Sequence, residues 1–200
     1  MEKQIVNGGG DMVTYCDAII KMKKLNTNII KMTTVILIGM CYAGKTTIGK
    51  LLGQRLGKSV LDSRDIFERE YGISENEYLK KHGREQFLVA EEKSLLQNFE
   101  NKVVSLGGSA IYYRDAMELL LRNKDYIIVW LDVPFSVIEK RKSLESWERP
   151  IIYPNGINTF EELYKERHTK YEKYHKLRIV ISDKDTPEDV VKKIMVKSLC

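Results

Sequence analysis

The segment "GMCYAGKT", residues 39–46, constrains the fold more than any other part of the chain, because it fits the pattern G-x-x-x-x-G-K-[ST]. The apolar run "TVILI" precedes it, and a helical pattern begins at Lys45. Gly39 and Gly44 allow a tight turn in which successive backbone N–H groups point at phosphate oxygens. The helix adds its positive end to the same anion. A strand, a loop and a helix in this order predict a site for a nucleoside triphosphate.

Side chains in and after this segment predict how the phosphates are held. The Lys45 ammonium supplies a point charge to the β- and γ-phosphates, and the Thr46 hydroxyl can ligate Mg²⁺. The residues of the segment expected to bind the nucleotide are Gly39, Ala43, Gly44, Lys45, Thr46 and Thr47. Asp62 ends the second predicted strand, where its carboxylate can reach Mg²⁺ through water. The alternative is that Asp62 caps a short following helix, a role that Ser63 or Asp65 could share.

From Thr34 the chain alternates short apolar runs with helical patterns. The predicted strands are residues 34–39, 58–63, 102–108, 125–133 and 177–182. The predicted helices are Lys45–Leu56, Arg84–Phe99, Arg114–Arg122, Pro134–Lys142, Thr159–His175 and Pro187–Leu199, the last capped by Thr186. Strands with continuous rather than alternating apolar residues are typical of parallel sheets covered on both faces. The pattern predicts an α/β fold with a doubly wound, five-stranded parallel sheet.

The composition excludes several other classes of protein. A length of 200 residues suits one domain, and no apolar stretch approaches the roughly 20 residues that span a membrane. The net charge of +5 comes from dispersed lysines, without a motif for nucleic acid. The three cysteines show neither metal-ligand nor disulfide spacing. We expect a cytoplasmic monomer that binds neither membranes nor nucleic acid.

Residues 1–33 differ from the rest of the chain, with a Gly triplet and no clear periodicity. They lack the continuous apolar region of a secretory signal. An organellar presequence is an alternative, although the segment contains no Arg and keeps Asp11 and Asp17. The preferred interpretation is a poorly ordered or non-native extension, with the core protein beginning near Met32. Residues 34–200 are expected to form the one folded domain.

Further motifs, in the same order along the chain, resemble shikimate kinase, a small P-loop kinase of the nucleoside-monophosphate-kinase fold. "LDSRDIFEREYGIS" resembles the "DTDxxIExxxGxS" segment of that family, and "HGREQFLVAEEKSLL" resembles its "GExxFRxxExxxL" helix. "VVSLGGSA" resembles its "GGG" strand end, "ERPII" its lid motif "RPLL", and "LYKERHTKYEKY" its "RxxxYxxxA" helix. The resemblance implies an ATP-dependent P-loop kinase domain with a mobile lid, which uses Mg²⁺ and phosphorylates a hydroxyl of a small acceptor.

The resemblance also implies roles for particular residues. Those expected to be catalytic are Lys45, Asp62 and Arg149, with Thr46 and Asp62 at the metal. Arg149, on the lid, would close over the transferring phosphate, and the region of Arg141 and Lys142 would lie against the adenine. Gly107 and Gly108 would approach the acceptor with their backbone. The residues expected to bind the acceptor are Arg64, Gly107, Gly108 and Arg167.

Two of these roles have support from the sequence itself. Arg167 lies on the helical stripe of an aromatic-rich helix, four residues before Tyr171. A buried guanidinium needs an anionic partner, which spacing alone leaves open between a ligand carboxylate and an internal Asp or Glu. Arg149 lies beside Pro150 in a segment whose prolines and Asn-Gly indicate mobility. There it could stabilise a transferring phosphoryl group, and the alternative is simple solvation.

The sequence departs from the family pattern on the acceptor side. The second acid of "DTD", which in the family binds acceptor hydroxyls and is the proposed base, falls on Arg64. The arginine of "FR", which helps to hold the acceptor carboxylate, falls on Leu88, and the third glycine of the triplet is Ser109. Arg64 cannot act as a base near neutral pH.

Three hypotheses follow from these departures. The preferred one is a kinase for a different, carboxylated acceptor, with Arg64 binding an anionic group. The second is a true shikimate kinase in which Asp65 is moved into place. The third is a nucleotide-binding module that does not turn over.

Overall fold

The computed structural model describes residues 33–144 and 151–198. The strands in this part of the chain are β1 (Thr34–Ile38), β2 (Ser59–Asp62), β3 (Lys102–Ser105), β4 (Tyr126–Asp132) and β5 (Leu177–Val180). They form one sheet in the order β2-β3-β1-β4-β5, and every pairing is parallel. The predicted α/β fold with a five-stranded parallel sheet is therefore confirmed.

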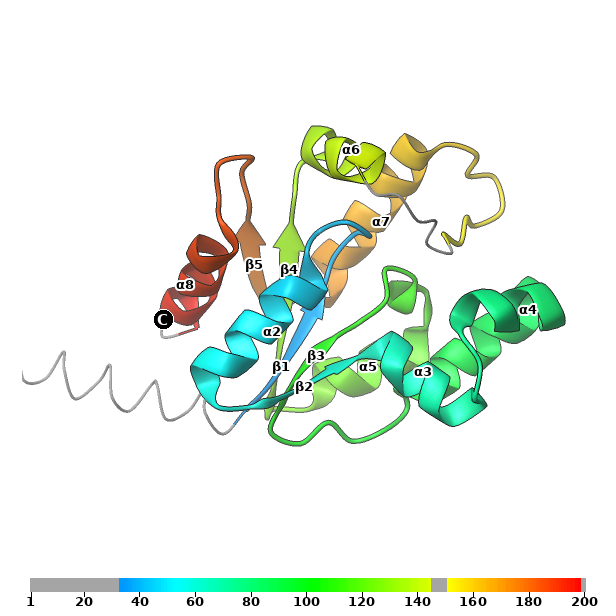
Figure 1. Cartoon of the computed structure of the whole chain (residues 1–200), viewed down its shortest axis with the longest axis horizontal. Coiled ribbons are helices and arrows are strands. Elements are labelled where there is room, and N and C mark those ends of the chain that lie inside the picture. Colours follow the sequence, from blue (N-terminus) through cyan, green and yellow to red (C-terminus); the bar gives the residue numbers. More distant parts are fainter. Residues whose placement is uncertain (1–32, 145–150, 199–200) are drawn as a thin grey trace, which may run out of the picture.

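Helices cover both faces of the sheet (Figure 1). They are α2 (Lys45–Leu56), α3 (Ser63–Tyr71), α4 (Glu75–Leu95), the short 3₁₀ helix η1 (Ala110–Tyr112), α5 (Arg114–Arg122), α6 (Phe135–Leu144), α7 (Phe160–Tyr174) and α8 (Pro187–Lys197). α2 packs against α8 on one face, and α5 packs against α7 on the other. Across residues 33–144 and 151–198, no helix combines the length and the apolar character that a membrane span requires.

Burial explains why the strand sequences are apolar without alternation. All five residues of β1 are buried, and β4 is buried along nearly its whole length. Since the strands are parallel, their carboxyl ends meet at one edge of the sheet, where the loops after β1, β2 and β3 emerge together. Ligands of open α/β sheets bind at this edge.

One predicted helix has the wrong bounds. The pattern places a helix at Arg84–Phe99, but α4 begins at Glu75 and ends at Leu95. Ser74 and Glu77 form a capping box that starts the helix, and Gly83, with φ 79 and ψ 172, breaks it in the middle. The first half was missed because its sequence, "ENEYLKKH", has few apolar residues to reveal a helical period.

Candidate active site

A cavity of about 510 Å³ lies at the carboxyl edge of the sheet. We divide its lining into three parts. The P-loop side comprises residues 41–48 and Asp62. The α4 side comprises Arg64, Glu75, Phe87, Glu91, Leu106, Gly107, Gly108, Ser109, Ile151, Ile152 and Arg167. The α8 side comprises Arg141, Leu144, Ile181, Asp185, Pro187 and Val190.

The P-loop side has the geometry of an anion site. Gly44 adopts a left-handed conformation, with φ 89, and starts α2 without a side-chain cap. The first-turn N–H groups of α2 are therefore left for another acceptor, at the positive end of the helix. The Lys45 ammonium donates to the carbonyls of Gly39 and Met40, at 2.8 and 2.9 Å. The lining includes Ala43, Gly44, Lys45, Thr46 and Thr47, whereas Gly39, at the start of the loop with φ 146, does not line the cavity.

Asp62 caps α3, which is one of the two alternatives that the sequence left open, and it also contacts the metal candidate Thr46. Its Oδ1 accepts from the backbone N–H of Arg64 at 3.2 Å and caps α3. Its Oδ2 accepts from the Thr46 hydroxyl at 2.8 Å. One carboxylate and one hydroxyl beside a phosphate site fit Mg²⁺, which takes few protein ligands and completes its shell with phosphate oxygens and water. Thr46 and Asp62 would therefore hold the metal, and their mutual hydrogen bond fixes both side chains.

The α8 side was largely missed by the sequence interpretation. Arg141, rather than Lys142, lines the cavity, and its guanidinium donates to the Tyr42 carbonyl at 3.2 Å. The Lys142 ammonium instead lies over the Phe160 ring, 5.0 Å from its centroid. Lys142 thus points away from the predicted nucleotide.

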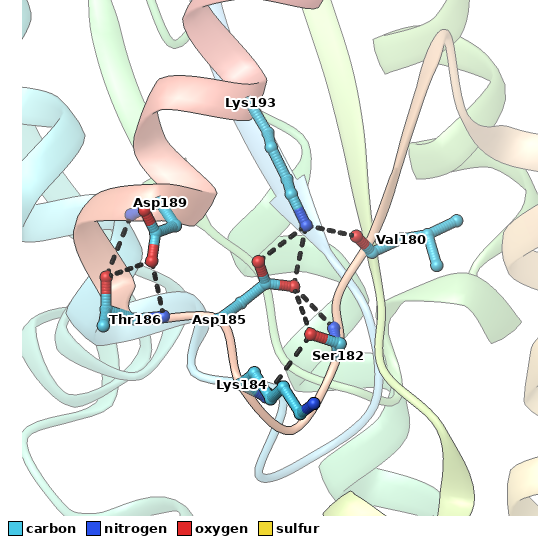
Figure 2. Close-up of polar contacts among 7 residues, drawn as sticks. All are labelled: Val180, Ser182, Lys184, Asp185, Thr186, Asp189 and Lys193. Carbon is cyan, nitrogen blue, oxygen red and sulfur yellow. Dashed lines mark hydrogen bonds and ion pairs between the residues drawn. The ribbon is translucent and has the colours of Figure 1, made fainter.

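Opposite Arg141, the loop between β5 and α8 is held by one carboxylate, as Figure 2 shows. Asp185 accepts from the Lys193 ammonium at 2.7 Å and from the backbone N–H of Ser182 at 2.6 Å. The bond from Lys193 lowers the pKa of Asp185. Thr186 begins α8 with a capping box to Asp189, as the sequence predicts for its cap. This loop is thus a fixed wall, on which a flat base could rest.

On the α4 side, two consecutive glycines face two opposite charges. A Cβ added to Gly107 would lie 2.8 Å from Oε1 of Glu91. A Cβ added to Gly108 would lie 2.8 Å from a terminal nitrogen of Arg167. Only glycine leaves room for both side chains this close to the backbone. The structure therefore brings together Gly107, Gly108 and Arg167, which the sequence assigned to the acceptor.

The Arg167 side chain is 2% exposed. It donates to the Tyr112 hydroxyl at 3.2 Å and to the Ile152 carbonyl at 2.8 Å. Within residues 33–144 and 151–198, no carboxylate oxygen lies within 4.0 Å of the guanidinium. Of the two partners that the sequence left open, an internal Asp or Glu is therefore not found in this part of the chain.

Glu91 is a buried carboxylate that the sequence interpretation did not single out. It accepts from the Ser109 hydroxyl at 2.8 Å and also from the Tyr113 hydroxyl. Burial raises its pKa, although these hydrogen bonds and the charge of Arg167 act in the opposite direction. Tyr112 and Tyr113 thus hold Arg167 and Glu91 in place.

Glu75, the first residue of α4, was also missed. It is 9% exposed and lines the cavity, yet its carboxylate has no hydrogen bond or ion pair with any described residue. Burial and, to a smaller extent, the charge of Glu91 raise the pKa of Glu75 to about 8. The guanidinium of Arg64 acts in the opposite direction, and Asp62 and Glu68 add to the increase. Arg64 itself lies 3.5 Å from Asp62.

We expect Glu75→Gln to stabilise the free protein increasingly as the pH rises from about 5 to 8. The folded state keeps a proton on Glu75 that the unfolded chain releases near the ordinary glutamate pKa of 4.5, so wild-type stability falls across this range. The gain at pH 8 should be on the order of a few kcal/mol. Urea unfolding at pH 5 and pH 8 measures it, with Glu85→Gln, an exposed change on the same helix, as the control. A constant difference between the variants at both pH values would contradict this expectation.

Two other positions that the sequence singled out do not line the cavity, and a third lies outside the described residues. Asp65 is exposed and does not line the cavity, so a local shift that brings it into the site is not observed. Leu88 packs against the core rather than on the cavity wall. Arg149 is one of residues 145–150, which lie outside the described residues. The predicted mobile lid around it includes these residues.

The sequence and the fold can be compared with known proteins. The family described as shikimate kinase matches residues 42–198. The chain is 32% identical to a shikimate kinase of Microcystis aeruginosa over 174 residues, which cover 84% of this chain and 87% of that protein. It is 26% identical to the shikimate kinase of Acinetobacter baumannii, solved in complex with shikimate, with a TM-score of 0.74 over 87% of this chain and 97% of that one.

Proteins named threonine synthase-like 1 are also similar. The chain is 37% identical to the Homo sapiens protein over 164 residues, which are 80% of this chain but only 22% of that protein. The chain therefore spans about a fifth of the length of the first curated relatives that it matches.

Proposed function

Because this chain belongs to the shikimate kinase family, we propose that it transfers the γ-phosphate of ATP to a hydroxyl of a small carboxylated acceptor other than shikimate. Members of this family are ATP-dependent kinases that use Mg²⁺. The observation that carries the proposal is Arg167, a buried guanidinium on the cavity wall without a carboxylate partner among the described residues. A buried cation of this kind is stabilised when a ligand supplies the carboxylate.

The P-loop side supports phosphoryl transfer as the reaction. In this proposal the first-turn N–H groups of α2 and the Lys45 ammonium bind the phosphates, while Thr46 and Asp62 hold the metal. Mg²⁺ supplies neutralisation of the phosphate charge when it is bound. The acceptor oxygen forms the new bond to phosphorus, the bond to the bridging oxygen of ADP breaks, and the hydroxyl proton is released to water. Arg149 would lie over the transferring group, on the basis of the "ERPII" motif alone.

The α4 side supports an acceptor other than shikimate. Arg64 occupies the position at which the family has the acid that binds acceptor hydroxyls. Leu88 occupies the position of the family's second carboxylate-binding arginine. Arg64 cannot accept a hydroxyl proton, and Leu88 cannot hold an anion. A ring with several hydroxyls thus loses two of the groups that would recognise it.

Shikimate itself is the second candidate. Its support is the family match and the similarity to an enzyme whose structure contains shikimate. Glu75, which lines the same side of the cavity as Arg64, could then replace the missing acid.

Release of ADP from Mg·ATP tests the proposal, with shikimate and a panel of hydroxy acids, polyols and nucleosides. We expect at least one carboxylated hydroxy compound to stimulate release with a kcat/KM about tenfold or more above that of shikimate. Fastest turnover with shikimate would support the second candidate instead. Tight, Lys45-dependent ATP binding without stimulation by any compound would favour a nucleotide-binding module.

A further inference from the structure

The charged side chains around the cavity do not balance one another evenly. Among the acids, Asp185 is paired with Lys193, and Asp62 lies beside Arg64. Among the cations, Lys45 and Arg141 lie on or against the P-loop, where they face the phosphates of the proposed nucleotide. The ionisable groups that remain on the α4 side are the carboxyl groups of Glu75 and Glu91, whose pKa values burial raises, and the guanidinium of Arg167.

Neither glutamate forms a hydrogen bond or an ion pair with a cationic side chain among the described residues, although the charge of Arg167 acts on Glu91 and that of Arg64 acts on Glu75. Glu91 is 2% exposed and accepts only from the neutral hydroxyls of Ser109 and Tyr113. The Glu75 carboxylate has no hydrogen bond to any described residue; the residue is 9% exposed, and its carboxylate opens onto the cavity. The pair lies close enough for the charge of Glu91 to act on Glu75. Buried carboxylates of this kind are stabilised by a cation that can also donate hydrogen bonds.

The family pattern would supply such a cation from the same helix, since its "FR" arginine falls on α4. Here that residue is Leu88, which packs against the core. Leu88 carries no charge and does not line the cavity, so this position supplies no cation to Glu75 or Glu91.

The two opposite charges of this side, Glu91 and Arg167, face two consecutive glycines. Gly107 faces Glu91 and Gly108 faces Arg167, each within 2.8 Å of a hypothetical Cβ. Consecutive Cα atoms are about 3.8 Å apart, so an anionic and a cationic group meet the cavity at neighbouring positions. A ligand that carries one positive and one negative group close together matches this order.

From this arrangement we infer that the acceptor is a hydroxy acid bearing a protonated amine, whose ammonium lies between Glu75 and Glu91 and whose carboxylate lies on Arg167. The inference rests on the proposed function and specifies its substrate class. An ammonium has three donors and no acceptor, so it can bond both carboxylates at once. A neutral hydroxyl in the same place has one donor and no charge, so it could not stabilise both glutamates in their ionised form.

Matched acceptor pairs test this inference. L-serine is compared with 3-hydroxypropanoate, and L-2-amino-4-hydroxybutanoate with 4-hydroxybutanoate, so that each pair differs only in the amine. Binding in the presence of Mg·ADP is measured by calorimetry, and ADP release from Mg·ATP is measured separately. We expect the amine to improve the dissociation constant by about tenfold or more in at least one pair.

Two variants locate the effect. Glu75→Gln keeps the size of the side chain but cannot become a carboxylate, so it should remove most of the preference for the amine. Glu85→Gln, exposed on the same helix, should leave the preference unchanged. Glu91→Gln is a less useful variant, because Ser109 and Tyr113 depend on that carboxylate.

The two readouts separate this inference from the proposed function. Preferential binding of the amine that Glu75→Gln abolishes, without phosphoryl transfer, would support the inference and overturn the proposed function. Turnover of acceptors without any preference for the amine would retain the proposed function and overturn the inference. Absence of binding by every amino acid of the pairs, or a preference that survives in Glu75→Gln, would also overturn the inference.

Discussion

Replacing Lys45 with Met should lower kcat for acceptor-dependent ADP release by about 10²- to 10³-fold or more. Lys45 is the first residue of α2, and its ammonium donates to the Gly39 and Met40 carbonyls. These bonds hold the ammonium beside the proposed phosphates. Phosphoryl transfer depends on positioning and on neutralisation of the phosphate oxygens, and Met supplies neither charge nor a hydrogen-bond donor. Steady-state kinetics with saturating Mg·ATP measures the loss.

Lys50→Met is the matched control for this variant. Lys50 lies on the same helix but is exposed and does not line the cavity. It should retain wild-type kcat, which separates loss of the phosphate contact from a general effect of removing a lysine from α2. Wild-type turnover by Lys45→Met would contradict the assignment of the P-loop side to ATP.

Replacing Arg167 with Lys should raise the acceptor KM by about 10²-fold, with little change in the KM for Mg·ATP. Lysine keeps the positive charge but cannot reproduce the planar set of donors that contacts Tyr112, the Ile152 carbonyl and a ligand carboxylate together. The same kinetic experiment measures both constants, using the best acceptor from the panel.

An exposed arginine provides the control for Arg167→Lys. Arg114 lies at the start of α5 and pairs with Glu118 at the surface, so Arg114→Lys should leave both KM values unchanged. Thermal unfolding of Arg167→Lys should be compared with the wild type, because the guanidinium is also part of the core. An unchanged acceptor KM in a folded Arg167→Lys protein would exclude Arg167 as the carboxylate site.

The sheet and the P-loop side could be predicted from the sequence because their information is local. Each strand is a continuous apolar run, and the residues from Gly39 to Thr47 follow one another without interruption. Asp62 was found because it ends a strand; its suggested capping role is confirmed by the contact with the Arg64 backbone, and its metal role stays a prediction.

The α4 side could be predicted only in part, because residues far apart in the chain meet there. Arg167 was found from the helical stripe, but its contacts with Tyr112 and Ile152 depend on tertiary packing. Glu75 precedes the predicted helix and lies among polar residues, so nothing in the local pattern separates it from a solvated side chain. Glu91 is one charge among several on α4, although it falls on the second glutamate of the quoted motif "GExxFRxxExxxL"; its contacts with Ser109 and Tyr113 depend on tertiary packing.

A competition assay tests the central claim most directly. The claim is that the P-loop side binds ATP as the family pattern implies, whereas the α4 side binds an acceptor other than shikimate. The protein is incubated with Mg·ATP and equal concentrations of shikimate and the hydroxy acids of the panel, and the phosphorylated products are identified by mass spectrometry. We expect the main product to be the phosphate ester of a carboxylated acceptor other than shikimate, with none formed by Lys45→Met. Shikimate phosphate as the main product would contradict the changed specificity and leave Arg64 and Leu88 as tolerated substitutions.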